Sequence, residues 1–320
     1  MPNGQTEPRF ILNQAAESAL PPEQDLERER FLREPFFEIL APAVWRAPAV
    51  FNSPHSGTLM PRELLAETAL SERELRQSED CYIDELFSGC LDHGAPMLRA
   101  LVSRAYLDVN REPFELDARM FAESLPGFMN STSSRALAGF GTVPRCVGDG
   151  HEIYRNKLAL AEALTRVDVF YRPYHRALNR LLNEARDSTG MVLLIDCHSM
   201  PSPGSSGKPV PDVVLGDRFG TSCNPEFVSA IEQFFAGQGL HVVRNRPYAG
   251  AFITSTYGAP QQNRHALQIE INRALYMNER TLERTTSFAG LKKLMTQLAG
   301  YIAVILQESL GAEMRKLAAE

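Results

Sequence analysis

The feature that most constrains this chain is an apolar run that stops abruptly at polar residues, within residues 190–201 (GMVLLIDCHSMP). Residues 191–195 have the length of a strand and no polar side chain, which is typical of a strand buried on both faces of a parallel or mixed sheet. Asp196 and His198 follow directly. Because open α/β sheets bind ligands at the carboxyl ends of their strands, the run predicts an α/β protein with Asp196 and His198 at its site.

Strand geometry indicates how these polar residues are oriented. Side chains alternate between the two faces of a strand, so Asp196 and His198 share one face and Cys197 points the other way. A neutral imidazole is a good zinc ligand, and a neighbouring carboxylate can orient it. The pattern therefore favours a metal site and argues against Cys197 as a nucleophile there. The alternative interpretation is a strand that simply ends in polar loop residues.

The rest of the chain alternates between strand and helix patterns. Strands are expected at residues 47–52, 95–102, 105–109, 191–195, 241–244 and 266–271. Helices are expected at residues 71–76, 80–93, 157–186, 225–235 and 281–310, and Pro173 should kink or split the third of them. The alternation indicates an α/β protein with a mostly parallel sheet.

Three segments look irregular. Residues 121–141 and 201–220 are rich in Pro, Gly and Ser, and the first belongs to a long excursion that we expect to cover a site. Residues 1–37 are rich in Pro, Gln, Glu and Arg. They predict a loosely ordered arm with one short helix at residues 24–32, followed by a single α/β domain at residues 38–320.

Composition narrows the class of protein. A net charge of -6, without Lys/Arg tracts, argues against a nucleic-acid partner. Five scattered cysteines form no CxxC pair, which favours reduced thiols. The start of the chain lacks a signal pattern, and no window suggests a membrane span, so we expect a soluble cytoplasmic protein without a membrane partner. The sequence carries no signal for an oligomeric state.

Polar groups follow several of the expected strands. His55 follows the first, Asp108, Asn110 and Arg111 follow the third, and Glu270 lies on the last. If the strands share one sheet, these groups converge with His198 at one edge. Two imidazoles and a carboxylate are typical of a zinc site, with another divalent metal as the alternative. A further carboxylate could then deprotonate a metal-bound water.

Several blocks of the sequence together resemble a known family. They are SPHSG (53–57), SEDCYIDEL (78–86), YLDVNREP (106–113), RPYHRAL (172–178), DCHSMP (196–201), PDVVLGDRFGTSC (211–223), YAGAFITSTYG (248–258) and HALQIEINRALYM (265–277). In this order they are similar to the N-formylglutamate amidohydrolase family, and more distantly to zinc carboxypeptidases and aspartoacylases.

The resemblance implies both a fold and an activity. The fold is a three-layer α/β/α domain with a mixed, mostly parallel central sheet, of the phosphorylase/hydrolase-like type. The activity is zinc-dependent hydrolysis of the amide of a small-molecule N-acyl amino acid, in the type case N-formyl-L-glutamate to formate and L-glutamate in histidine degradation.

The resemblance also implies roles for single residues. His55 and His198 match the two histidine ligands of the metal. Carboxypeptidase-like sites use HxxE, but Thr58 stands at the glutamate position here. The acidic ligand is therefore left open between Asp80, which we prefer, and Asp84. For Asp80 the alternative is a capping role at the start of a helix.

Glu270 matches the general base, and the alternative interpretation is a sheet-edge carboxylate that pairs with Arg273. Asn110 and Arg111 match a pair that binds the substrate carboxylate, which a guanidinium can hold with two parallel hydrogen bonds. N-formylglutamate carries two carboxylates, so a second cation is expected. The candidates for this second cation are Arg246 and Arg172. Three further residues are expected to contact the site residues and orient them without touching the substrate: Asp196, His265 and His175.

Two rival functions remain at this stage. The first keeps the metal but acts on another N-acyl amino acid, a short peptide or a cell-wall amide. The second is a non-catalytic protein that binds an anionic ligand, which would predict loss of Glu270 or of one histidine; both histidines and Glu270 are present.

Overall fold

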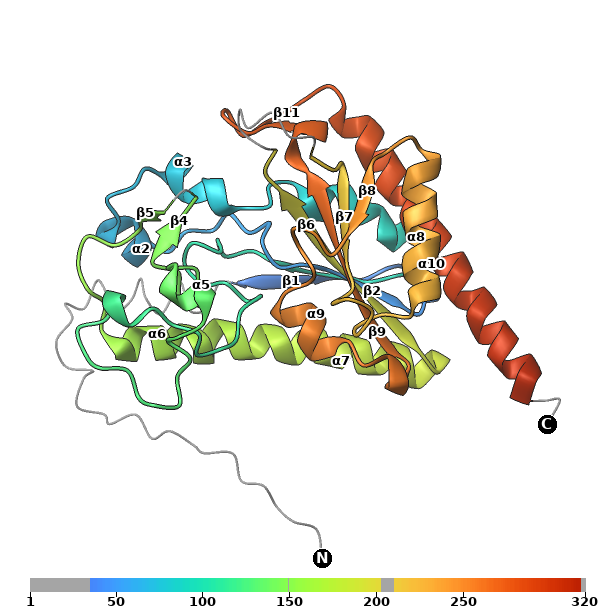
Figure 1. Ribbon diagram of the computed structural model, residues 1–320, viewed down its shortest axis with the longest axis horizontal. Coiled ribbons are helices and arrows are strands. Elements are labelled where there is room, and N and C mark those ends of the chain that lie inside the picture. Colours follow the sequence, from blue (N-terminus) through green and yellow to red (C-terminus); the bar gives the residue numbers. More distant parts are fainter. Residues whose placement is uncertain (1–34, 149, 203–209, 318–320) are drawn as a thin grey trace, which may run out of the picture. The chain divides into compact units, whose positions relative to one another are not determined.

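The structure is a computed structural model that describes residues 35–148, 150–202 and 210–317 (Figure 1). From Phe36 on, these described residues form one compact unit. The arm predicted at residues 1–37, with its helix at 24–32, lies almost entirely outside the described residues.

A seven-stranded sheet forms the centre of this unit, in the order β1-β3-β2-β6-β9-β7-β8. The strands are β1 (Phe37–Leu40), β2 (Ala49–Ser53), β3 (Met97–Ala100), β6 (Val192–Met200), β7 (Val213–Gly216), β8 (Val242–Arg244) and β9 (Arg264–Asn272). Strands β3, β2, β6 and β9 run parallel to one another, β1 is antiparallel to β3, and β7 is antiparallel to β9 but parallel to β8. The predicted mixed, mostly parallel sheet is confirmed.

Helices cover both faces of the sheet, which gives the three predicted layers (Figure 1). One face carries α4 (Ile83–Phe87), α8 (Pro225–Gly237) and α10 (Phe288–Leu317), and the other carries α7 (Arg172–Thr189) and α9 (Phe252–Tyr257). Odd-numbered residues of β6, including Ile195 and Cys197, join the core under the first group. Asp196 and His198 therefore face the opposite side, as strand alternation predicts.

The remaining elements are short and lie mostly between β2 and α7. They are α2 (Arg62–Glu67), α3 (Glu72–Leu75), α5 (Ser134–Leu137), α6 (Leu160–Arg166), the β4–β5 pair (Cys146–Val147 with His151–Glu152) and the β10–β11 pair (Met277–Asn278 with Glu283–Arg284). Short 3₁₀ turns occupy Arg76–Ser78, Ser88–His93, Ala118–Met120, Pro260–Gln262 and Arg273–Leu275. All five cysteines are free and buried.

Helix α10 corrects one sequence-based expectation. By length and composition alone, Phe288–Ala312 is long and apolar enough to cross a membrane, although no such window was expected. Its buried positions recur every three or four residues: Leu291, Met295, Leu298, Ile302 and Leu306. These side chains belong to the core beneath the sheet, which is the pattern of an amphipathic helix packed on one face.

Three expected elements differ from the structure. Residues 105–109 form a turn and not a strand, and Tyr106 and Leu107 both donate backbone hydrogen bonds to Ser103 O. The 201–220 segment was expected to be a loop, but it contains β7. The helix at 157–186 is interrupted by a π-helical turn at Val167–Tyr171, before Pro173. Pro173 then lies in the first turn of α7, where a missing N–H costs little.

Candidate metal and catalytic site

The pairing of β6 with β9 places the two central site residues opposite each other. In the parallel register His198 aligns with Glu270, and Asp196 aligns with Gln268. All four side chains are buried. Because alternate residues of neighbouring strands share a face, these groups gather on the side of the sheet that carries α7 and α9.

His55 reaches the same place from the loop after β2. Gly57 allows this loop to pass close to the end of β3, because a Cβ at Gly57 would lie 2.3 Å from Val102 O. The Ser53 and Ser56 hydroxyls are 2.5 Å apart, and Asp80 N–H donates to His55 O at 2.9 Å. The loop that carries His55 is therefore bound directly to the segment that carries Asp80.

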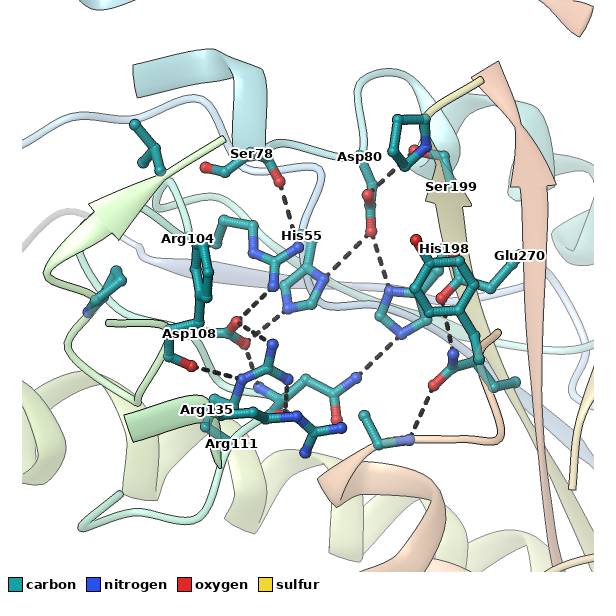
Figure 2. A pocket seen from close by; sticks show the side chains of 18 of the residues that line it. His55, Ser78, Asp80, Arg104, Asp108, Arg111, Arg135, His198, Ser199 and Glu270 are labelled. Atoms are coloured by element: carbon teal, nitrogen blue, oxygen red, sulfur yellow. Dashed lines mark hydrogen bonds and ion pairs between the residues drawn. The ribbon is translucent and has the colours of Figure 1, made fainter. Parts of the chain in front are cut away.

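Three potential ligand atoms converge at the centre of the site. Asp80 Oδ2 lies 3.2 Å from His55 Nδ1 and 3.0 Å from His198 Nδ1. One ligand atom from each residue lies within 4.8 Å of the others, and all three residues are buried. Figure 2 shows the three side chains pointing toward one another, with Glu270 beside His198. Two imidazole nitrogens and one carboxylate oxygen form a donor set that suits a divalent metal such as zinc.

Each histidine is held from behind by another carboxylate. His55 Nε2 lies 2.7 Å from Asp108 Oδ1, and His198 Nε2 lies 3.0 Å from Asp196 Oδ2. Both Nε2 atoms thus have an acceptor, which leaves both Nδ1 atoms facing Asp80. This carboxylate–histidine arrangement is the usual support of metal-binding imidazoles. Asp196 stands where the sequence analysis expected it.

The second oxygen of Asp80 is also fixed. Oδ1 accepts hydrogen bonds from the Ser199 hydroxyl at 3.0 Å and from Arg273 at 3.2 Å. Arg273 also donates to Ser199 Oγ and to Glu79 O. Arg273 therefore pairs with Asp80, and the structure does not support the alternative in which it pairs with Glu270.

The electrostatics of the site favour a bound cation. Burial opposes ionisation of Asp80, but hydrogen bonds from His198 and His55 outweigh it and hold its pKa well below the usual range. Burial likewise opposes a charged His198, yet Asp196 and Asp80 raise its pKa well above 6.5. The buried carboxylates around the imidazoles thus attract positive charge, as expected of a site that binds a metal.

Glu270 is a carboxyl group poised to exchange protons near neutral pH. Burial raises its pKa to about 7, partly offset by the charge of His198. The Gln268 side-chain amide donates to Glu270 Oε1 at 2.7 Å, and Gln268 Oε1 in turn accepts from Ala251 N–H at 3.0 Å. The carboxyl is therefore oriented by its neighbours, with a pKa suited to general acid–base chemistry.

These groups line a cavity of about 360 Å³. Its walls come from the His55 loop, the 104–111 segment, residues 135–148 and residues 247–251. The irregular segment expected to cover a site thus contributes Arg135, Phe140 and Gly141. The volume falls within the range of small-molecule sites.

Asn110 and Arg111 both reach the cavity, but in different ways. The Asn110 side chain accepts from Ile253 N–H at 2.8 Å, donates to Asp196 at 3.3 Å and lies 3.1 Å from His198 Nε2. Its amide is thus engaged in holding the site together. Arg111 donates to Phe140 O and Asn110 O, and its Nη2 lies 3.7 Å from Asp108.

His175 supports the site indirectly. Its Nε2 donates to Val109 O at 2.8 Å, so its Nδ1 accepts from the Tyr257 hydroxyl, also at 2.8 Å. It therefore ties α7 and α9 to the segment that carries Asp108 and Asn110. Burial lowers its pKa to about 4, which keeps the imidazole neutral.

The structure places Asp80 and Asp84 differently, and it sets His265 apart from the cavity. Asp84 pairs with Arg99 at 2.7 Å, so Asp80 is the carboxylate that the structure brings to both histidines. His265 lies at the start of β9, several residues from Glu270, where its Nδ1 accepts from Asn224 N–H at 3.3 Å and its ring contacts Phe227. It braces the start of α8, so its expected role behind the site is wrong.

Neither arginine expected for a second substrate carboxylate lines the cavity. Arg172 is exposed and pairs with Asp168 at 2.7 Å. Arg246 is exposed and precedes Pro247 and Tyr248, which do line the cavity. The structure instead places Arg104 and Arg135 there, and neither was proposed from sequence. Asp108 was noted beside Asn110, but its contact with His55 carried no sequence signal.

His265 gives a testable pH dependence. Burial lowers its pKa to about 4, whereas an unfolded histidine titrates near 6.5. The unfolded chain therefore takes up a proton first, so stability is fully present above pH 6.5 and lost as the pH falls toward 4. We expect His265 to lower the free energy of unfolding by about 2 kcal/mol between pH 7 and pH 5. The free energy of unfolding in urea should depend less on pH in His265→Gln than in wild type. His241→Gln, which changes an exposed histidine, should match wild type. An equal pH dependence in all three proteins would contradict the expectation.

Comparisons with known proteins agree with this geometry. The family model described as N-formylglutamate amidohydrolase matches residues 47–277. An N-formylglutamate deformylase from Pseudomonas aeruginosa is 30% identical over 247 residues, covering 76% of this chain and 86% of that protein. One from Pseudomonas putida is 28% identical over 239 residues, covering 73% and 83%. The crystal structure of N-formylglutamate amidohydrolase from Ralstonia eutropha JMP134 superimposes with a TM-score of 0.80 at 34% identity, covering 85% of this chain and 99% of that one. The chain belongs to the N-formylglutamate amidohydrolase family.

Proposed function

We propose that this protein is a metal-dependent amidohydrolase that converts N-formyl-L-glutamate and water to formate and L-glutamate, as a cytoplasmic step of histidine degradation. The observation that carries the proposal is the buried His55–Asp80–His198 cluster facing Glu270 in a cavity lined by arginines. Relatives of this chain named N-formylglutamate deformylase support the choice of substrate.

The donor set fits a divalent metal, and zinc is the first choice for two imidazoles and a carboxylate. His55 and His198 would bind through Nδ1, because Asp108 and Asp196 occupy the two Nε2 atoms. When bound, the metal would polarise the formyl carbonyl and lower the pKa of a coordinated water.

Glu270 is assigned as the general base and then as the general acid. It takes a proton from the water whose oxygen forms a bond to the formyl carbon. When the C–N bond breaks, Glu270 returns that proton to the leaving nitrogen, so formate and the amino group of glutamate are released. A carboxyl pKa near 7 suits both transfers, because the group can gain and lose a proton at neutral pH.

Arg111 is assigned to the α-carboxylate of the substrate. Its guanidinium is partly buried and lines the cavity, and bonds to Phe140 O and Asn110 O fix its plane. A fixed guanidinium can hold a carboxylate with two parallel hydrogen bonds. Anchoring that group at a set place relative to Glu270 would select amides of single amino acids.

The test is formate release from N-formyl-L-glutamate by the purified protein, compared between metal-depleted and zinc-reconstituted samples. We expect release that disappears on metal removal and returns with zinc. Stoichiometric zinc binding without formate release would contradict the substrate. Equal release by the depleted sample would contradict the metal dependence.

A further inference from the structure

The cavity contains four arginines, and three of them are bound to protein groups. Arg104 pairs with Asp108 at 2.6 Å, and Arg273 pairs with Asp80 at 3.2 Å. Arg111 is held by two backbone carbonyl oxygens and lies 3.7 Å from Asp108. The fourth, Arg135, is different: within residues 35–148, 150–202 and 210–317, no hydrogen bond or ion pair joins its guanidinium to another group.

The backbone of Arg135 is nevertheless well anchored. Arg135 lies in α5, whose first turn is capped by Ser133, and the Ser133 hydroxyl donates to Glu115 at 2.5 Å. Phe140 N–H donates to Arg135 O at 2.9 Å, which closes the α5 segment onto the wall of the cavity. The backbone of Arg135 is therefore fixed, while its charged side chain lines the cavity without a protein partner among the described residues. This arrangement leaves the guanidinium available to bind a ligand.

The surroundings of Arg135 call for an anion. Figure 2 shows Arg104, Arg111 and Arg135 together on the Asp108 side of the cavity, with Glu270 on the opposite side. Burial lowers the pKa of Arg111, the charge of Asp108 opposes this only in part, and the positive charges of Arg104 and Arg135 lower it further. Because like charges close together are unfavourable, an anionic group bound between Arg111 and Arg135 would stabilise both.

We propose that Arg135 binds the side-chain carboxylate of the substrate, and so makes the enzyme select acidic N-acyl amino acids. This rests on the proposed function, in which Arg111 binds the α-carboxylate. Two guanidinium groups on one wall then match the two carboxylates of formylglutamate, while the formyl group points toward Glu270. Arg135 thus fills the role of the second cation, for which Arg172 and Arg246 were the candidates from sequence.

The test compares N-formyl-L-glutamate with N-formyl-L-glutamine, which has nearly the same shape but an uncharged side chain. For Arg135→Gln we expect kcat/KM on formylglutamate to fall roughly 10- to 100-fold, mainly through a higher KM. A fall of this size is expected when one charge-assisted hydrogen-bond contact to the substrate is lost. Activity on formylglutamine should stay nearly unchanged. Arg135→Lys should recover part of the loss, because lysine keeps the charge but not the fork. Arg172→Gln is the matched control and should leave both substrates unaffected.

A binding measurement separates this inference from the proposed function. Calorimetry of the zinc-loaded protein should show L-glutamate binding more tightly than L-glutamine, and Arg135→Gln should abolish that preference. If wild type hydrolyses neither substrate, the proposed function fails, while the glutamate preference still decides the role of Arg135. Equal losses on both substrates, no loss on formylglutamate, or no preference for glutamate in the wild type would overturn the inference. If Arg135→Gln melts early, a smaller loss on formylglutamate in Arg135→Lys, with formylglutamine unchanged, together with the wild-type preference for L-glutamate, decides the inference.

Discussion

Glu270→Gln is expected to lower kcat on N-formyl-L-glutamate by roughly 10² to 10⁴-fold, the usual contribution of a general acid–base group. The amide has nearly the same size and can still accept a hydrogen bond from Gln268, so the strand pairing should persist. It cannot take a proton from water, and both proposed proton transfers therefore fail. The measurement is formate release under saturating substrate.

Two controls make the Glu270 result specific. Bound zinc should remain at the wild-type level in Glu270→Gln, because Glu270 is not a member of the His55–Asp80–His198 cluster. Glu232→Gln removes a carboxylate from α8, where it pairs with Arg244, and should leave turnover unchanged. A Glu270→Gln enzyme that keeps wild-type kcat with full zinc would show that another group moves the proton.

His198→Ala is expected to remove both metal binding and activity. The change deletes one of three donor atoms, leaves the buried Asp196 without its imidazole partner and leaves Asp80 with the imidazole of His55 alone. We expect zinc affinity to fall by more than the roughly 10- to 100-fold that is typical when only an outer partner of a metal ligand is lost. The measurement is zinc per chain after dialysis, together with formate release.

The matched control for His198→Ala is His241→Ala, which removes an exposed histidine outside the cavity. It should retain wild-type zinc content and turnover. Circular dichroism and thermal melting establish that each variant is folded. Tight, stoichiometric zinc in a folded His198→Ala protein would contradict the assigned ligand set.

Sequence patterns were reliable where local chemistry dictates structure. The run before Asp196 has no polar side chain, so it had to be buried, and strand alternation then fixed the faces of His198 and Cys197. The same reasoning failed for residues 105–109. Tyr106 is buried in a turn, where the Arg166 guanidinium lies over the tyrosine ring, 3.9 Å from the ring centre. Burial in this turn produces the same apolar sequence pattern as a strand.

The cations of the cavity show a second limit of sequence patterns. Arg135 lies in a segment without helical or strand periodicity, and its place depends on the bond of Ser133 to Glu115 and on its own backbone bond with Phe140, which no motif indicates. Arg172 and Arg246 were suggested by their neighbours in sequence. Proximity along the chain says little about a shared cavity when the intervening segments are loops.

The sequence by itself determined the α/β class, the position of β6 and β9, and the polar groups His55, His198 and Glu270 at the ends of or within buried strands. It did so because a buried strand imposes its pattern locally, residue by residue. Only the tertiary structure decided that Asp80 and not Asp84 faces the histidines, that Asp108 holds His55, and that Arg135 lines the cavity. Those residues lie in loops, turns or the short helix α5, and their partners are brought to them by long-range packing of the whole sheet.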